Sequence, residues 1–262
     1  MWWHEKTWKQ LDLLDRNLPV VVPIASCEQH GPHLPVWVDT LQLTGILERV
    51  EPLVSEQALF LPVLWLGSSH HHADFPGTLS LTPFLYAQVL KGLLENVIRA
   101  GFRRVLVLNG HGGNEAPALA ALNELVGTSD EADRISLALA TWWKIASDGL
   151  DADALGMETP RLSHACEYET SLTLALRPDL VRMSAAPEGW EEQRPWVQPA
   201  SLPNVASIAR FHRFTRTGAL GRPAAATAQK GERILSVVCE SLQRLIVDFA
   251  AWPVPEAGRR EG

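Results

Sequence analysis

Histidine and acidic side chains are concentrated in a few short stretches of this sequence. Seven of the nine histidines fall in four such stretches, and three of the four directly follow segments with the pattern of a buried strand. Imidazole and carboxylate groups together supply the nitrogen and oxygen ligands that Zn²⁺ and Mn²⁺ accept in proteins. The clustering predicts a metal site, against the simpler interpretation that each histidine only forms a hydrogen bond at a strand end. The seven are His30, His33, His70, His71, His72, His111 and His164.

The first stretch reads EQHGPHLPVWVD and runs from Glu28 to Asp39. Glu28 and His30 are two residues apart, so in an extended chain their side chains project to the same face. Gly31 and Pro32 can supply a turn that brings Asp39 back onto this pair. The stretch therefore offers two carboxylates and an imidazole to one point. The alternative interpretation is a solvated polar loop.

A later stretch, NGHGGN, places His111 between glycines directly after an apolar segment. Glycine lets other groups lie close against the backbone. The order of strand, glycine-rich loop and helix is also typical of dinucleotide-binding proteins, but their G-x-G-x-x-G motif requires glycine where Glu115 stands. A phosphate-binding P-loop is excluded because no G-K-[ST] sequence follows. The stretch indicates a histidine at a strand end, with only weak support for phosphate binding.

The stretch SHACEYETS offers His164, Glu167 and Glu169 in a segment expected to be helical. On a helix, His164 and Glu167 are three residues apart and share a face. Glu167 and Glu169 would diverge by about 200°, because a helix of 3.6 residues per turn rotates about 100° per residue. The two carboxylates are therefore not expected to serve the same metal, and one of them is expected to support the structure.

Three consecutive histidines at 70–72 cannot all face one point, so at most one or two are expected to reach a site. The FPGT sequence at 75–78 reads as a rigid turn that positions them. Cys27 lies beside this chemistry and could act as a nucleophile, but its apolar neighbours favour a buried structural thiol. The G-x-S-x-G sequence of serine hydrolases is absent.

Alternating strands and helices must position these residues. Short apolar segments predict strands and segments with apolar residues at three- to four-residue spacing predict helices. This alternation predicts a mostly parallel sheet covered on both faces, with ligands bound outside the carboxyl ends of its strands. The segment 184–222 has no clear period and is expected to cross the surface or form an oligomer contact. The predicted strands are 18–26, 59–66, 104–108 and 135–142, and the predicted helices are 5–16, 40–54, 84–100, 115–127, 165–176 and 225–250.

Composition excludes several classes of protein. The 262 residues are 46% hydrophobic and 20% charged with a net charge of −7, which excludes a disordered chain and a basic nucleic-acid binder. Three widely separated cysteines form neither a disulfide framework nor a thiolate zinc site, and they fit a reducing compartment. Neither a signal peptide nor a bilayer-spanning segment is visible. A cytoplasmic protein with small-molecule partners, and no nucleic acid or membrane, is expected.

The motifs EQHGPHLP with Asp39, FPGT, NGHGGN, HACEYETS and, at 221–232, GRPAAATAQKGE are spread over about residues 5–248. In this combination and order the chain resembles the creatininase (creatinine amidohydrolase) family. The resemblance implies a three-layer α/β/α sandwich with a mostly parallel central sheet, formed by one domain over residues 1–262. It also implies a hydrolytic centre with two divalent ions per chain (Zn²⁺, Mn²⁺ or both, or Fe²⁺) and a homo-oligomer, commonly a hexamer.

The resemblance implies roles for individual residues. Glu28, Asp39 and His111 match the ligands of one divalent ion. His30 and Asp39 match ligands of the second, so that Asp39 bridges the two. Creatininase also uses a glutamate two residues after the histidine of its NGH motif, and this sequence has Gly113 at that place.

Relatives that share NGHGGN take the missing ligand from the segment that contains HACEYETS. Glu167 is therefore assigned as the replacement ligand and as a catalytic residue, and Glu169 as its support. His164 matches a family histidine near the substrate and is expected to be a proton donor.

The implied activity is hydrolysis of a C–N amide-type bond in a small cyclic or N-acyl compound by a metal-activated water. Creatinine itself is not expected as the substrate, because the aromatic residue that follows NGH in creatininase is replaced by Gly112. Cys166 and His70 stand where many relatives have glycine and glutamate, which changes the polarity of the pocket. Trp143 and Trp37 are candidates for the pocket wall or for the core.

Other functions remain open at this point. Relatives with these motifs include deformylases of a formylamino-pyrimidine intermediate and peptidases that trim a modified peptide. A non-catalytic metal- or ligand-binding subunit is a further alternative, although such a protein would not need a bridging carboxylate. A nucleotide-binding oxidoreductase is disfavoured by the glycine spacing.

Overall fold

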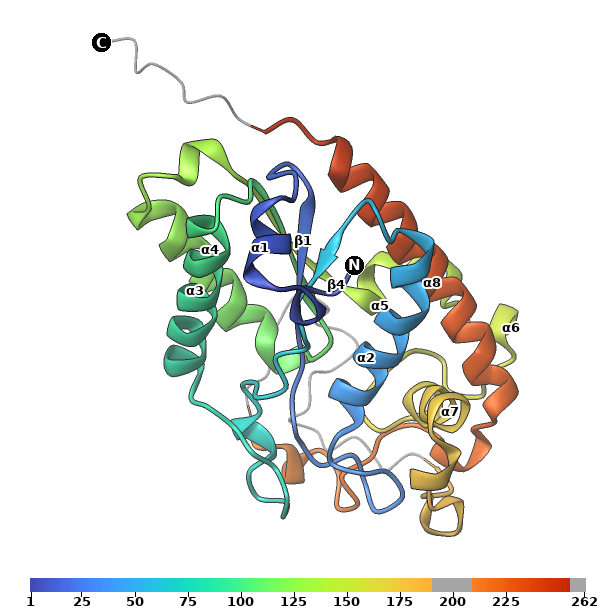
Figure 1. The fold of residues 1–262 in the computed structure, drawn as a ribbon. Coiled ribbons are helices and arrows are strands. Elements are labelled where there is room, and N and C mark those ends of the chain that lie inside the picture. The colour runs from blue at the N-terminus through green and yellow to red at the C-terminus, as the bar shows by residue number, and fades with distance from the viewer. Residues whose placement is uncertain (190–208, 255–262) are drawn as a thin grey trace.

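Four parallel strands form the centre of the protein, in the order β2-β1-β3-β4. The computed structural model describes residues 1–189 and 209–254. All four predicted strands are present, and helices lie on both sides of the sheet (Figure 1). The strands are β1 (Pro19–Ile24), β2 (Leu59–Phe60), β3 (Arg104–Asn109) and β4 (Ser136–Thr141). The helices are α1 (Trp8–Asp12), α2 (Val38–Val50), α3 (Pro83–Arg99), α4 (Glu115–Thr128), α5 (Trp142–Ile145), α6 (Ala152–Leu155), α7 (Glu167–Leu176) and α8 (Ala228–Ala251).

The edge strand β2 is shorter than the segment 59–66 predicted from the sequence. After Leu61, whose N–H still donates to the Val21 carbonyl of β1 at 3.0 Å, comes Pro62, which has no backbone N–H to donate to a ladder. Pairing with β1 resumes only as an isolated bridge between Ile24 and Leu64. On its other side, the backbone N–H of Phe60 donates to the carbonyl of Met1 at 2.8 Å, so the N-terminal segment covers this edge.

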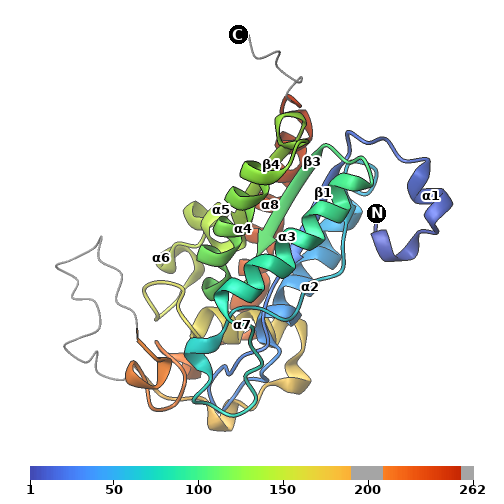
Figure 2. The ribbon, with the colours of Figure 1, turned by 90° about the vertical axis from the view of Figure 1, so that its left-hand side faces the viewer.

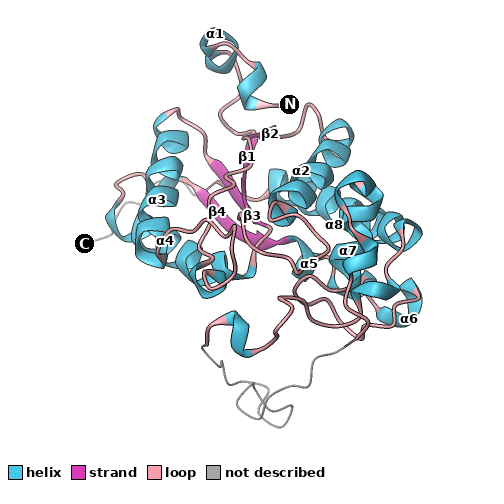
Figure 3. Cartoon of the chain, turned by 90° about the horizontal axis from the view of Figure 1, so that it is seen from below, coloured by secondary structure: helices cyan, strands magenta, loops and turns pink. Residues whose placement is uncertain are grey.

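Successive residues of the central strands point into two different cores. In β1, Val20 and Val22 pack with α3 and α4, whereas Val21 packs with α2, α7 and α8. β1 is buried along its whole length, which explains why it reads as a continuous apolar run. Seen along the strands in Figure 3, the sheet separates these two groups of helices. The predicted three-layer α/β/α arrangement with a parallel sheet is confirmed.

The loops that follow the strands gather at one end of the molecule, the lower end in Figure 2. Parallel strands all deliver their carboxyl ends to the same edge, so the histidine-rich stretches after β1, β2 and β3 meet there. α7 begins at the same end and packs along α8 (Figure 1). This edge is therefore where the predicted site residues can come together.

We expect Gly231→Ala to destabilise the protein, because α7 and α8 approach each other through this residue. A Cβ atom at position 231 would lie 2.0 Å from the backbone oxygen of Ser171, so the two helices would have to separate. Overpacking of this kind costs about 1–3 kcal/mol, of which helix propensity returns about 1 kcal/mol. We expect the free energy of unfolding, measured by urea denaturation, to fall by up to about 2 kcal/mol. Gly92→Ala on α3 is the matched control: nothing lies within 4 Å of its Cβ position, and a gain of about 0.5–1 kcal/mol is expected. Equal effects of the two substitutions would contradict the close contact.

Some predictions from the sequence reach beyond the described residues. The single domain predicted for residues 1–262 stays a prediction, because residues 190–208 and 255–262 lie outside the description. The same holds for much of the predicted surface segment 184–222. None of the helices in the described ranges is long and apolar enough to cross a membrane.

Candidate metal centre

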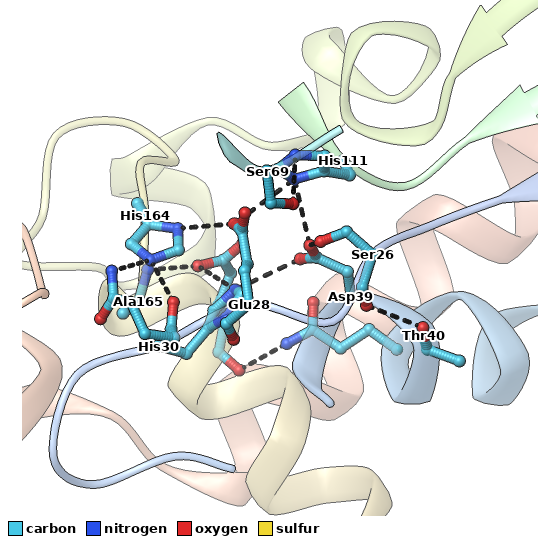
Figure 4. Close-up of polar contacts among 12 residues, drawn as sticks. Ser26, Glu28, His30, Asp39, Thr40, Ser69, His111, His164 and Ala165 are labelled. Atoms are coloured by element: carbon cyan, nitrogen blue, oxygen red, sulfur yellow. Dashed lines mark hydrogen bonds and ion pairs between the residues drawn. The ribbon is translucent and has the colours of Figure 1, made fainter. Parts of the chain in front are cut away.

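Asp39 lies at the middle of a buried group of carboxylates and imidazoles (Figure 4). It stands in the first turn of α2, where the turn at Gly31 and Pro32 brings it back beside the chain that leaves β1. Its Oδ2 atom accepts a hydrogen bond from Ser26 Oγ at 2.6 Å, and Thr40 Oγ1 donates to the Ser26 carbonyl at 2.8 Å. These bonds fix the carboxylate with one oxygen toward each of two ligand groups.

The first ligand group joins Glu28 and His111 to one oxygen of Asp39. His111 Nδ1 lies 3.3 Å from Glu28 Oε1 and 3.1 Å from Asp39 Oδ2. The other ring nitrogen, Nε2, faces the Ser68 carbonyl at 3.2 Å and Ser69 Oγ at 3.1 Å. The carbonyl can only accept, so this network assigns the ring proton to Nε2 and leaves the lone pair of Nδ1 toward the carboxylates.

The second ligand group joins His30 and Glu169 to the other oxygen of Asp39. His30 Nε2 lies 3.2 Å from Asp39 Oδ1 and 3.8 Å from Glu169 Oε2. His30 Nδ1 donates to the Glu28 carbonyl at 3.1 Å, so Nε2 again carries the free lone pair. Asp39 thus faces both groups at once, with Glu28 and His111 on one side and His30 and Glu169 on the other.

The structure does not bring Glu167 into either group, which corrects the assignment made from the sequence. Glu167 is fully buried on the opposite side of α7, where Oε1 accepts a hydrogen bond from Lys230 Nζ at 2.5 Å. Oε2 accepts from the backbone N–H groups of Glu158 and Thr159 at 2.9 and 2.7 Å. Glu169 lies in the cluster instead, beside His30 and Asp39, so the two glutamates have exchanged the positions expected from the sequence.

The reason for this exchange is where α7 begins. The helix starts at Glu167, so His164 lies in a turn before it and the argument from a shared helix face does not apply. Ala165 has a φ of +48°, an unusual conformation for a residue with a Cβ atom, and its backbone N–H donates to Glu169 Oε2. No feature of one sequence reveals such a turn.

The unpartnered atoms and the interatomic distances of the cluster suit cation binding. Glu28 Oε2 and His30 Nε2 are buried, and neither forms a hydrogen bond with any residue that the structure describes. Two donors that each bind one zinc ion at about 2.1 Å lie roughly 3–3.5 Å from each other. Most of the separations around Asp39 fall in this range, and imidazole with carboxylate is a ligand set for Zn²⁺ or Mn²⁺. The residues present therefore suit a centre for two divalent cations.

The electrostatics of the cluster point the same way. Burial, the largest influence, lowers the pKa of His111, but the Glu28 and Asp39 carboxylates raise it to about 10. Burial also opposes the charged form of His30, and the Asp39 and Glu169 carboxylates nevertheless raise its pKa well above the usual value. The pKa of Glu169 is raised, mainly by burial. Three buried carboxylates therefore attract positive charge into the cluster, either as a proton on the imidazole nitrogen that faces them or as a cation that takes the place of this proton.

The cluster opens into a cavity of about 300 Å³. Trp143, Leu162 and Phe211 form apolar parts of its wall, which confirms one predicted wall residue and adds two. Phe211 comes from the aperiodic segment after residue 208, so no pattern in the sequence indicated it. Trp37 is not part of this wall: it lies against Trp65 in a separate hollow, with ring centroids 5.3 Å apart. Lysine and arginine are absent from the described lining.

His164 lies between the cluster and the cavity wall. Its Nε2 lies 2.8 Å from the Gln29 carbonyl oxygen and 2.9 Å from Gln29 Nε2, and its Nδ1 lies 3.5 Å from Glu28 Oε1. Phe211 meets its ring edge to face with centroids 4.6 Å apart. Burial, followed by the charges of His30 and His72, holds the pKa of His164 well below its usual value. The imidazole is therefore held in one orientation with Nδ1 toward Glu28.

Cys27 does not take part in this chemistry. It is buried, its thiol lies 3.8 Å from the Gly77 carbonyl, and burial raises its pKa. This agrees with a structural thiol and not with an activated nucleophile.

Together, the parallel sheet and the two ligand groups at its carboxyl edge define an α/β protein whose side chains suit a pair of divalent cations. The chain belongs to the creatininase family, since the family model described as creatinine amidohydrolase matches residues 4–246.

Curated relatives include proteins with three kinds of name. The chain is 31% identical over 247 residues to a mycofactocin precursor peptide peptidase of Mycobacterium tuberculosis, with 89% of this chain and 86% of the relative covered. It is 28% identical over 256 residues to a creatinine amidohydrolase of Pseudomonas putida, with 91% and 93% covered. A third relative, a 3-dehydro-scyllo-inosose hydrolase of Thermotoga maritima, is 26% identical over 273 residues, with 95% of this chain and 82% of the relative covered. The first two names describe hydrolysis of amide bonds, one in a peptide and one in a small ring.

Solved creatininases share the fold. A mutant creatininase in a zinc–zinc form has a TM-score of 0.80 at 26% identity, with 94% of this chain and 97% of that chain covered. A manganese form of creatininase has a TM-score of 0.75 at 27% identity, with the same coverage. Both metals are ones that the ligand set described above accepts.

Proposed function

We propose that this protein is a metal-dependent amidohydrolase that hydrolyses a C–N amide-type bond in a small cyclic or N-acyl compound. The observation that carries the proposal is the position of Asp39, which turns one oxygen toward Glu28 and His111 and the other toward His30 and Glu169. These five side chains would hold two divalent cations, with Asp39 between them. Bound in this way, divalent ions lower the pKa of water and polarise a substrate carbonyl.

The other residues of the cavity would orient the substrate and move a proton. Hydrolysis adds water to the carbonyl carbon and breaks the C–N bond, so the leaving nitrogen must receive a proton. His164 is suited to carry that proton at Nδ1, because Nε2 is engaged by Gln29. Trp143 and Phe211 would pack against the flat face of the substrate, because they form apolar parts of the cavity wall.

A second candidate is a peptidase that removes residues from a modified peptide. The specific observation in its favour is the 31% identity to mycofactocin precursor peptide peptidase, against 28% to creatinine amidohydrolase. Gly112 also leaves the mouth of the cavity open, because nothing lies within 4 Å of its Cβ position. The proposed cations and their ligands would be the same for both substrates.

A substrate panel tests the proposal. Protein loaded with Zn²⁺ or Mn²⁺ is incubated with lactams and cyclic ureides, N-acyl amines, a formylamino-pyrimidine and short peptides. We expect at least one cyclic compound to open to a product heavier by one water, or one N-acyl compound to split into an acid and an amine that together contain the added water, and no turnover by Asp39→Ala. Cleavage confined to peptides would establish the second candidate. Two bound cations without turnover of any compound would indicate a binding subunit and overturn the amidohydrolase.

The site of action and the assembly are further parts of the proposal. All three cysteines are free and buried, which fits the reducing cytoplasm. Small molecules are the expected partners, and the net charge of −7 disfavours nucleic acid. The homohexamer rests on the family resemblance alone.

A further inference from the structure

The histidine-rich loop after β2 places one imidazole inside the cavity without an evident partner. Residues His70–His72 form a short 3₁₀ turn, which points the three rings in different directions. The ring of His70 is exposed and that of His72 is buried against Phe211, whereas His71 lines the cavity beside the cluster. Within the described residues, the His71 side chain forms no hydrogen bond or ion pair, whereas His72 Nδ1 lies 2.8 Å from Gln29 Nε2 and His72 Nε2 lies 3.6 Å from Glu28 Oε1.

The position of His71 matches that of a metal ligand. One of its ring nitrogens lies within 4.8 Å of ligand atoms of both Glu28 and His111. Its ring stands nearly parallel to that of His111, with an interplanar angle of 17° and centroids 5.9 Å apart. The second oxygen of Glu28, Oε2, is buried and has no hydrogen-bond donor in the described part of the chain. Two imidazoles and an unpartnered carboxylate oxygen thus surround one point.

Gly113 makes room for this arrangement. A Cβ atom at position 113 would lie 2.3 Å from the Ser68 carbonyl oxygen, 2.4 Å from His111 Nε2 and 2.8 Å from His71 Cε1. A side chain at 113 and the imidazole of His71 therefore exclude each other. The absence of a side chain at 113 leaves the space beside His111 to the histidine of the neighbouring loop.

We propose that His71 is a fourth protein ligand on the Glu28 side of the centre and makes that side selective for zinc. This inference rests on the proposed two-cation function. The Glu28 side would then offer two imidazoles with the Glu28 carboxylate, next to the Asp39 oxygen that faces His111, whereas the His30 side offers one imidazole with two carboxylates. Imidazole favours Zn²⁺, and carboxylate-rich sites accept Mn²⁺ more readily. The two sides would therefore differ in affinity, with Zn²⁺ held more tightly beside His71.

Metal titration of His71→Ala tests this inference without an activity assay. We expect one of the two Zn²⁺ ions to bind about 10–100-fold more weakly than in the unaltered protein, as judged by competition with a chromophoric chelator. The other site should keep its affinity. With Co²⁺ as the probe, the visible absorption bands of one site should change and should return when free imidazole is added to the variant. His70→Ala, which removes the exposed neighbouring ring, is the matched control and should leave both affinities unchanged.

The possible failures are distinguishable. Unaltered Zn²⁺ affinities in His71→Ala would overturn the role of His71 and leave the two-cation centre intact. If the Zn²⁺ affinities change but imidazole does not restore the Co²⁺ absorption bands, His71 acts only through the conformation of its loop, and the inference is also overturned. If the unaltered protein binds no Zn²⁺ or Co²⁺, or if Asp39→Ala still binds two ions, the proposed function fails as well.

Discussion

Asp39→Ala is expected to lose both divalent cations. Each of its oxygens faces a different ligand group, at 3.1 Å from His111 Nδ1 and 3.2 Å from His30 Nε2, so one substitution removes a ligand from both. Loss of a hydrogen-bond partner behind a metal ligand already weakens binding about 10–100-fold, so loss of a shared ligand should weaken it at least 100-fold. Metal content after dialysis against a weak chelator should fall from two equivalents to none.

Asp39→Asn refines this test. An asparagine keeps the shape and one carbonyl oxygen but carries no charge, so at most one equivalent of metal should remain. Asp74→Asn, on the histidine-rich loop, is the control: Asp74 pairs with Arg210 and His212 outside the cluster, and the variant should keep two equivalents. Two equivalents retained in Asp39→Ala would contradict the bridging role.

The residues around Asp39 could be predicted because parallel strands converge. Two neighbouring parallel strands precede these residues: β1 leads to Glu28 and His30, and β3 leads to His111. The register of β1 and β3 places the carboxyl ends of the two strands side by side, independently of the loop conformations. The structure brings together all four residues that were predicted as ligands from these loops. The turn at Gly31 and Pro32 was the only further step needed for Asp39.

The positions of Glu167 and Glu169 in the SHACEYETS stretch could not be predicted from the sequence, because they depend on one backbone dihedral angle. Periodicity predicted a helix from 165, and the helix begins at 167 after the positive φ of Ala165. A shift of two residues turns a helix by about 200°, which exchanges an inward for an outward side chain. The partner of Glu167, Lys230, is 63 residues away on another helix. Long-range pairs of this kind leave no periodic signal.

Glu167→Ala is expected to cause a large loss of stability while leaving the metal centre complete. Glu167 is fully buried and holds Lys230 Nζ together with two backbone N–H groups, so its removal leaves a largely buried ammonium group and two unsatisfied donors. Removal of one partner from a buried ion pair costs about 3–5 kcal/mol. Urea denaturation in the presence of a chelator should show a decrease of this size in the free energy of unfolding, because bound cations then contribute nothing. The folded fraction of the metal-loaded variant should still contain two equivalents.

Two further variants show whether this effect belongs to the buried pair. Lys144→Ala breaks the exposed pair between Lys144 and Glu115, whose side chains are 62% and 33% exposed, and should change stability by less than about 1 kcal/mol. Glu167→Leu combined with Lys230→Met replaces both buried charges by apolar groups and should recover much of the loss, because no charge is then left unpaired. A metal content that fell in Glu167→Ala as it does in Asp39→Ala would restore Glu167 as a ligand. The contrast between the two variants thus separates the carboxylate that anchors α7 to α8 from the one that serves the centre.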